Sequence, residues 1–237
     1  ARANAAGGGG GNATDNGGAG TVVLKGAGQT YGTLRVDNRG TVGQATVLPS
    51  LGSGTAQGGT GGATLVTDRA VAIPGYFAGH WVEVKRGGSL LGTWRIGTVA
   101  DRTVTLEPNG SDVATLQAGD LWQGVYRFDE VELEGEAIVR SDDPVRNTAT
   151  SITGNVTVDQ ITAGALRVKA GAKLTHPAST ATAARRLDLV VSGTLTIEEG
   201  GSIDVTGRGY PAGATYPGAG GSTSASGSHV GTGGVEG

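Results

Sequence analysis

The chain has no cysteine and no methionine among its 237 residues. Without cysteine, a disulfide scaffold, a thiolate zinc site and a cysteine nucleophile are all excluded. Aromatic residues are scarce at 4%, so a thick aromatic core can form in one place only. No apolar stretch approaches the roughly 18 residues of a membrane-spanning helix, and no signal peptide is recognisable. If the protein is exported, we therefore expect this chain to be a mature or excised fragment.

A surplus of positive charge is also missing. The 18 Lys and Arg residues stand against 21 Asp and Glu residues, which gives a net charge of −3 with both signs mixed along the chain. Such a mixture contains no basic stripe of the kind that attracts a phosphate backbone. We therefore expect no nucleic-acid partner.

Glycine is what the chain has in excess, with 46 residues. Each ordered glycine loses more backbone freedom than any other residue, so this excess must serve the fold. The glycines follow no three-residue period, which excludes collagen, and the 37% of hydrophobic residues gather in short alternating runs. The pattern predicts an all-β chain in which strands alternate with glycine-rich connectors.

Composition divides the chain into four segments. Residues 1–62 combine a glycine-rich segment with the first short strands, whereas residues 63–130 hold seven of the ten aromatic residues. Dense period-two alternation between turn formers in this second segment predicts a compact antiparallel β insert, a small barrel or sandwich. Residues 131–207 carry thinner, regularly spaced strands, and residues 208–237 form a glycine-rich tail or a connector to a next repeat.

The strands of residues 131–207 vary one phrase, a turn glycine followed by a short run with alternate aliphatic residues. Gly-Ala-Lys-Leu at 171–174 and Gly-Thr-Leu-Thr-Ile at 193–197 are examples. This is the pattern of a parallel β-helix or solenoid, in which inward Val, Ile and Leu stack on neighbouring coils and glycine turns the corners. An ordinary β-meander is the alternative. The solenoid is favoured because few turns carry the Asn-Gly or Asp-Gly signature of a hairpin.

The glycine-rich ends have two possible roles. Residues 1–20 and 208–237 could act as flexible linkers. If they are ordered, they would instead pack as extended polyglycine-like segments, or cap the solenoid, because no side chain holds their backbones apart.

No catalytic constellation is visible. The three histidines, His80, His176 and His229, lie at a strand edge, before a proline and in the glycine-rich tail. The sequence has no nucleophile elbow, zinc-protease motif or phosphate-binding loop. We therefore predict a non-catalytic chain in which His80 is packed or caps a strand.

The acidic residues form the one pattern that suits a metal ion. Glu130, Glu132 and Glu134 alternate along one strand and are expected on the same solvent face, where their simplest role is to keep a strand edge soluble. The alternative is a weak calcium site, because calcium prefers several carboxylate oxygens. Asp142 and Asp143 are further candidates, although a turn explains this pair most simply. No other cofactor is expected.

Four aromatic residues are candidate ligand-binding residues: Trp81, Trp94, Trp122 and Tyr126. Exposed rings of this type stack on sugars or meet another protein. For the three tryptophans, a folded core is the favoured alternative.

Three glycine-rich segments carry a further signal: GGAGTVVLK…QTYGTLRVDN, LTIEEGGSIDVTGRGYPAG and GGSTSASGSHVGTGG. Together they resemble the glycine-rich β-solenoid proteins of the Gram-negative cell surface, adhesin-like repeat proteins of the kind predicted in myxobacteria and their relatives. The resemblance covers about half of the chain. It implies an elongated, exported β-helical stalk with projecting modules, and it brings no catalytic residue.

The sequence thus predicts a structural or adhesive segment of a large secreted or cell-surface, fibre-like bacterial protein. Its expected partners are other copies or repeats of the same protein and cell-surface glycans on a host or prey. Two alternatives stay open. One is a polysaccharide-active or carbohydrate-binding β-helix protein, and the other is a segment of a phage or injection-system fibre.

Overall fold

The structure is a computed structural model that describes residues 5–10, 15–109 and 112–211. In these ranges the regular elements are β-strands and short 3-10 turns such as η2 (Gly75–Phe77), with no α-helix. The expectation of an all-β chain is therefore confirmed. No helix of the described part is long and apolar enough to cross a membrane. Most of the expected tail, including His229, lies outside the described residues.

The chain divides into two compact units, which are described separately. Unit 1 comprises Ala1–Val47, Phe128–Arg140 and Asn147–Gly237, and unit 2 comprises Leu48–Arg127 and Ser141–Arg146. The sequence expectation set the aromatic insert at 63–130. Unit 2 begins earlier than that, and it also takes in a short segment from farther along the chain.

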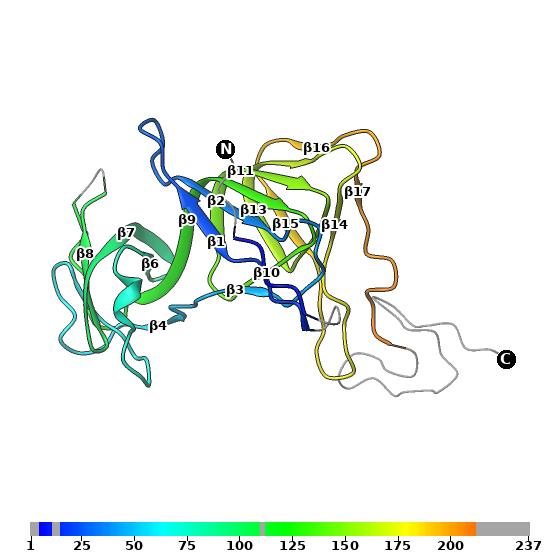
Figure 1. Cartoon of the computed structure of the whole chain (residues 1–237). Coiled ribbons are helices and arrows are strands. Elements are labelled where there is room, and N and C mark those ends of the chain that lie inside the picture. Colours follow the sequence, from blue (N-terminus) through cyan, green and yellow to red (C-terminus); the bar gives the residue numbers. More distant parts are fainter. Residues whose placement is uncertain (1–4, 11–14, 110–111, 212–237) are drawn as a thin grey trace. The chain divides into compact units, whose positions relative to one another are not determined.

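Two groups of strands alternate along the chain in unit 1 (Figure 1). The first contains β2 (Thr33–Asp37), the end of β9 (Leu121–Glu134), β11 (Val145–Thr153), β13 (Gln160–Val168), β15 (Asp188–Val191) and β16 (Leu195–Ile197). The second contains β3 (Thr46–Leu48), β10 (Ala137–Ser141), β12 (Asn155–Val158), β14 (Lys173–Thr175) and β17 (Ser202–Ile203). Pairing is parallel between β2 and β9, between β13 and both β15 and β16, and along β10, β12, β14 and β17.

The parallel pairs place aliphatic residues opposite one another at long, repeated steps. Ala137 lies opposite Val156, Val156 opposite Leu174, and Leu174 opposite Ile203, which are steps of 19, 18 and 29 residues. The longest step contains the segment between β14 and β15. The core of unit 1 consists of the inward residues of these strands, among them Leu34, Val36, Val131, Leu133, Ile152, Val156, Ile161, Leu166, Val168 and Leu174.

The two ends of this arrangement differ. At one end β1 (Thr21–Leu24) pairs with β2 in the antiparallel sense. At the other end Leu166 and Val168 of β13 are 1% and 0% exposed, but their partners Leu195 and Ile197 of β16 are each 47% exposed. In the part of the chain that the structure describes, these aliphatic positions of β16 are thus only partly covered.

The glycine-rich N-terminal segment packs backbone against backbone where the structure describes it. Gly17 N–H donates to Gly8 C=O (2.9 Å), and Gln44 N–H donates to Asn16 C=O (3.0 Å). A Cβ added at Gly18 would lie 2.5 Å from the backbone oxygen of Gln44. Only glycine fits such a close approach, so glycine serves packing here.

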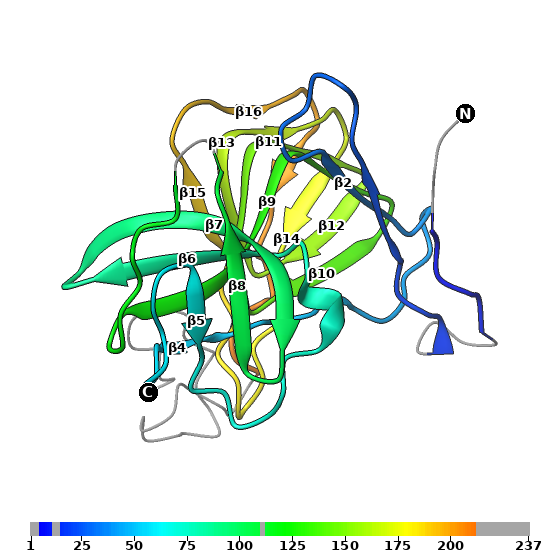
Figure 2. The same cartoon turned by 90° about the vertical axis from the view of Figure 1, so that its left-hand side faces the viewer.

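Unit 2 is an antiparallel sheet of short and long strands, shown in Figure 2. Its strands are β4 (Ser53–Thr55), β5 (Thr64–Val66), β6 (Trp81–Arg86), β7 (Ser89–Ala100), β8 (Thr103–Glu107) and the beginning of β9. Hydrogen-bonded neighbours follow the order β4, β9, β6, β7, β8, β5, and every pair is antiparallel. The backbone of Gln57, just after β4, donates to Val66 C=O of β5 (2.8 Å). The core gathers Leu51, Leu65, Phe77, Val82, Val84, Trp94, Ile96, Leu106, Leu116 and Trp122.

Candidate functional site

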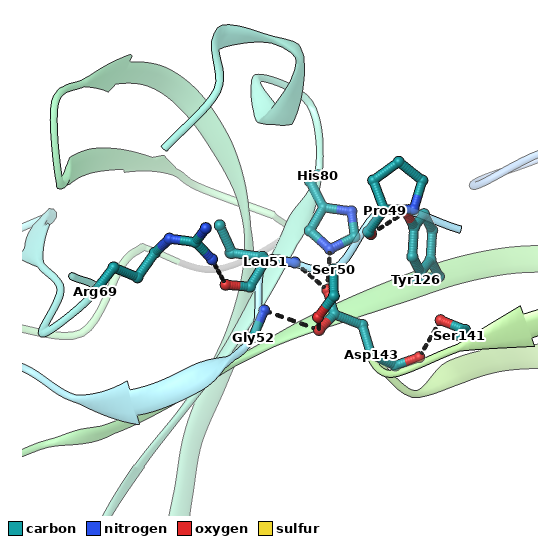
Figure 3. Close-up of polar contacts among 9 residues, drawn as sticks. All are labelled: Pro49, Ser50, Leu51, Gly52, Arg69, His80, Tyr126, Ser141 and Asp143. Atoms are coloured by element: carbon teal, nitrogen blue, oxygen red, sulfur yellow. Dashed lines mark hydrogen bonds and ion pairs between the residues drawn. The ribbon is translucent and has the colours of Figure 1, made fainter. Parts of the chain in front are cut away.

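Asp143 is the centre of a polar cluster in unit 2 (Figure 3). Its carboxylate accepts hydrogen bonds from Ser50 Oγ (2.7 Å) and from the backbone N–H groups of Leu51 (2.7 Å) and Gly52 (3.0 Å). His80 Nε2 lies 3.2 Å from the same carboxylate, and the Asp143 side chain is 1% exposed. One buried carboxylate thus ties the chain at 50–52 to the edge of β6.

The Asp143 carboxylate is stabilised in its charged form. Burial by itself would raise its pKa, but the hydrogen bonds from His80, Ser50, Leu51 and Gly52 hold the pKa below the usual range. Four donors therefore compensate for the loss of water around the charge. A group held this firmly acts as a structural tie.

Ser50, His80 and Asp143 are the residue types of a hydrolytic triad, but their side chains contact one another in a different order. In a triad, the histidine lies between the serine and the carboxylate and takes the proton of the serine. Here Ser50 Oγ bonds to Asp143 Oδ1, and His80 bonds to Asp143 Oδ2. The carboxylate lies in the middle, so His80 is not placed to activate Ser50.

Tyr126 belongs to the same cluster. Its ring packs edge-on against His80 with the centroids 4.5 Å apart, and its hydroxyl donates to Pro49 C=O (2.6 Å). Burial raises the pKa of Tyr126, and the charges of Asp143 and Tyr76 add to this effect. The ring of this candidate ligand-binding residue therefore makes its contacts with other residues of unit 2.

The tryptophans contribute mainly to the core of unit 2. Trp94 and Trp122 are 3% and 2% exposed, and Trp122 Nε1 donates to Asp68 (3.1 Å). Neither ring can stack on a ligand. Trp81 is partly buried, and the guanidinium of Arg127 lies 5.1 Å from the centre of its ring.

The glutamates of β9 do not share one solvent-exposed environment. Glu130 is exposed, but Arg35 of β2 lies 3.0 Å from Glu132 and 2.5 Å from Glu134. The Glu134 side chain is 8% exposed, so the expectation of a common solvent face is wrong for this residue. The reason is the parallel pairing of β2 with β9, which sets Arg35 directly opposite Glu132.

Arg35 supplies Glu132 and Glu134 with the positive charge that a metal ion would provide in a calcium site. Its pKa is raised: burial alone would lower it, but the hydrogen bond to Asp37 and the charges of Glu134 and Glu132 outweigh burial. In the described part of the chain, no group of three or more His, Asp or Glu side chains is arranged to hold a metal ion. Of the other calcium candidates, Asp142 is exposed and Asp143 is the buried tie described above.

Two grooves hollow the outer faces of the sheets. In unit 1, a groove of about 410 Å³ is lined by Glu130 and Glu132 of β9, Ser151 of β11, and Arg167 and Lys169 at the end of β13. In unit 2, a groove of about 320 Å³ lies over β4, β6 and β9. Two cross-strand rows line it, one of Ser53, Gln123 and Glu83 and one of Thr55, Leu121 and Lys85.

Comparison with protein-family models, with curated proteins and with solved structures finds no match to this chain. Sequence reasoning missed Arg35, Ser50 and the groove of unit 2. Arg35 follows the alternation of polar and apolar residues in its strand, so no local signal marked its burial against the glutamates.

Proposed function

We propose that this chain is a structural and adhesive segment of a fibre-like, exported bacterial surface protein and that it has no catalytic role. In this proposal unit 1 is a parallel β-solenoid, and unit 2 is a barrel-like insert between two of its strands. The observation that carries the proposal is the in-register stacking of aliphatic residues in unit 1, which continues to β16, whose inward residues are only half covered in the described part of the chain.

The stacking has the regularity of coils. Strands of the two groups alternate along the chain, and equivalent positions recur after 18 or 19 residues where no longer loop intervenes. A solenoid gains its stability from contacts between neighbouring coils, so it can be extended by adding coils of the same kind. Such an extension needs no disulfide cross-links, which suits a stalk that contains no cysteine.

The end of unit 1 at β16 fits a place where further coils add. Leu195 and Ile197 stand at the positions that Leu166 and Val168 occupy one coil earlier, yet nearly half of each side chain is exposed. Aliphatic residues that are exposed side by side on a strand favour contact with another surface. Another coil of the same protein is the partner with matching geometry.

The polar clusters support a non-catalytic role. In unit 2, Asp143 stands between Ser50 and His80, which leaves no general base on the serine. In unit 1, Glu132 and Glu134 are ion-paired with Arg35, so they are not poised as an acid–base pair. The enzymatic alternative therefore has no assembled residue set in the described part of the chain.

The proposal is tested on cells and on the purified chain. Antibodies raised against the chain should label intact cells of the source bacterium, and immunogold electron microscopy should place the label on extended structures. Labelling that needs permeabilised cells would refute the surface location. Degradation of pectin, alginate or a glucan by the chain, with or without calcium, would refute the non-catalytic assignment.

A further inference from the structure

The groove of unit 2 combines polar and apolar groups in a fixed grid. One row carries a hydroxyl, an amide and a carboxylate, from Ser53, Gln123 and Glu83. The adjacent row carries a hydroxyl, an alkyl group and an ammonium group, from Thr55, Leu121 and Lys85. The short side chains of β4 lie beside longer ones on β9 and β6, which creates the hollow. Because the grid stands on three hydrogen-bonded strands, its groups are preorganised.

The ion pairs of Glu83 leave Lys85 as the charged group of the groove that can take an anionic ligand. Glu83 is 3% exposed, and two cations share it: Lys85 Nζ lies 3.0 Å from Oε1, and Arg146 Nη2 lies 2.7 Å from Oε2. The groove itself is lined by one charge of each sign, Glu83 and Lys85, and Arg146 pairs with Glu83 from outside this lining. The Glu83 charge is therefore compensated without Lys85, which leaves the Lys85 ammonium group for a ligand. The Lys85 side chain is 44% exposed, so its remaining donors are accessible to a ligand.

Leu121 gives the groove an apolar surface. This residue is 51% exposed although it lies between Thr55 and Lys85 on the sheet. A sugar ring presents hydroxyls at its rim and C–H groups on its face, so a grid of hydroxyl, amide and ammonium groups around one alkyl side chain complements it. The volume of about 320 Å³ is at the lower end of small-molecule sites. It suits one or two sugar rings.

We propose that the groove of unit 2 binds an acidic sugar, a hexuronic acid or a short oligomer of one. The carboxylate of the sugar pairs with Lys85, its hydroxyls bond to Gln123 and Ser53, and its C–H face lies on Leu121. This inference goes beyond the structural role and does not depend on it. The cell-labelling test and the binding test can fail separately.

The test uses the full chain, with galacturonic acid and a galacturonate trimer as acidic probes and with galactose and a maltotriose as neutral ones. Binding is measured by titration calorimetry and by protein-observed NMR shifts. The acidic probes should bind about tenfold more tightly than the neutral ones, because a charge-assisted hydrogen bond is lost with the carboxylate. Their binding should weaken as salt is added. If the galacturonate trimer binds more tightly than the monomer, the natural ligand is part of a polymer. Equal affinities of trimer and monomer indicate a free sugar acid.

Matched variants locate the site. Lys85→Gln should weaken acidic-probe binding about tenfold, and Arg102→Gln, which removes the same charge from an exposed position elsewhere in unit 2, should leave binding unchanged. Ser53→Trp fills the groove without touching its charges and should abolish binding. Far-UV circular dichroism and thermal melts show that each variant is folded.

Three results would overturn the proposal. These are equal affinity for acidic and neutral probes, equal weakening by Lys85→Gln and Arg102→Gln, and no measurable binding by the folded wild-type chain. The second result would show that the acidic probes respond to the net charge of the chain and not to Lys85. A fourth result, retained binding in a folded Ser53→Trp variant, would place the sugar elsewhere and would overturn the proposal as well.

Discussion

Asp143 is held by four donors in a place where water is excluded, and this balance decides what the residue can do. A buried carboxylate without partners would become protonated, but here the donors keep its pKa low. The charge is therefore present at neutral pH, and it ties residues 50–52 to His80. Because the pKa of Asp143 is lower in the folded state than in the unfolded state, the charged form stabilises the fold.

Replacing Asp143 with asparagine tests this tie. The free energy of unfolding at pH 7 should fall by about 3 kcal/mol. The asparagine side chain cannot accept all four hydrogen bonds, so a buried donor is left without its acceptor. The contribution of the wild-type carboxylate is present above about pH 4 and is lost as pH falls through its lowered folded pKa. Urea unfolding at pH 7 and pH 3 should therefore show a smaller pH effect in Asp143→Asn than in the wild type. The exposed Asp142→Asn variant is the control, and an identical pH effect in both variants would contradict the assignment.

Arg35 has the corresponding role in unit 1. It lies against three carboxylates, those of Asp37, Glu132 and Glu134. Removing one member of a buried ion pair leaves a charge without compensation, which costs more than the pair itself contributes. Glu134, with its side chain 8% exposed, is the member that depends most on Arg35.

We expect Arg35→Met to lower the free energy of unfolding by about 3 kcal/mol. Adding Glu134→Gln to Arg35→Met should restore part of the loss, because the uncompensated charge is removed as well. A double-mutant cycle measured by denaturant unfolding isolates this coupling. Additive effects of the two substitutions would show that Arg35 acts through its packing and not through Glu134.

At the scale of elements, the neighbours of a strand determine how deeply its aliphatic residues are buried. Leu166 of β13 and Leu195 of β16 are partners in one parallel ladder, and they belong to the same sequence pattern. Their exposures, 1% and 47%, differ because β13 has a strand on both sides, whereas among the described strands β16 has a neighbour on one side only. The same residue type in the same pattern thus contributes differently to stability.

The matched pair Leu166→Ala and Leu195→Ala measures this difference. Leu166→Ala should cost about 2–5 kcal/mol of unfolding free energy, as large-to-small substitutions in a core do. Leu195→Ala should cost less than about 1 kcal/mol, because half of its surface already contacts water. Chemical denaturation at a low protein concentration gives both values. Equal costs would mean that β16 is covered in solution.

For the whole molecule, the sequence was sufficient to predict an all-β chain and an antiparallel, aromatic-rich segment. Both rest on local alternation, which can be read within one strand. The Asp143 cluster and the Arg35 pairs could not be predicted, because their partners are far apart in sequence. Arg35 and Glu132 are separated by 97 positions, and Leu51 and Asp143 by 92. Contacts of this kind depend on which strands become neighbours, and local pattern does not determine that.

The uncovered end of unit 1 has a consequence for the behaviour of the whole chain in solution. Leu195 and Ile197 are exposed aliphatic residues on β16, which has no further strand beside it in the described part of the chain, and such strands associate when nothing covers them. We expect the isolated chain to self-associate as its concentration rises, with the sedimentation coefficient increasing in velocity ultracentrifugation. Replacing both residues with lysine should keep the chain monomeric across the same range, because charges on an edge strand oppose pairing. Lysine at the exposed Val71 of unit 2 is the control and should leave association unchanged. Association that persists in the double variant would place the contact on another surface and would remove the main support for coil addition at β16.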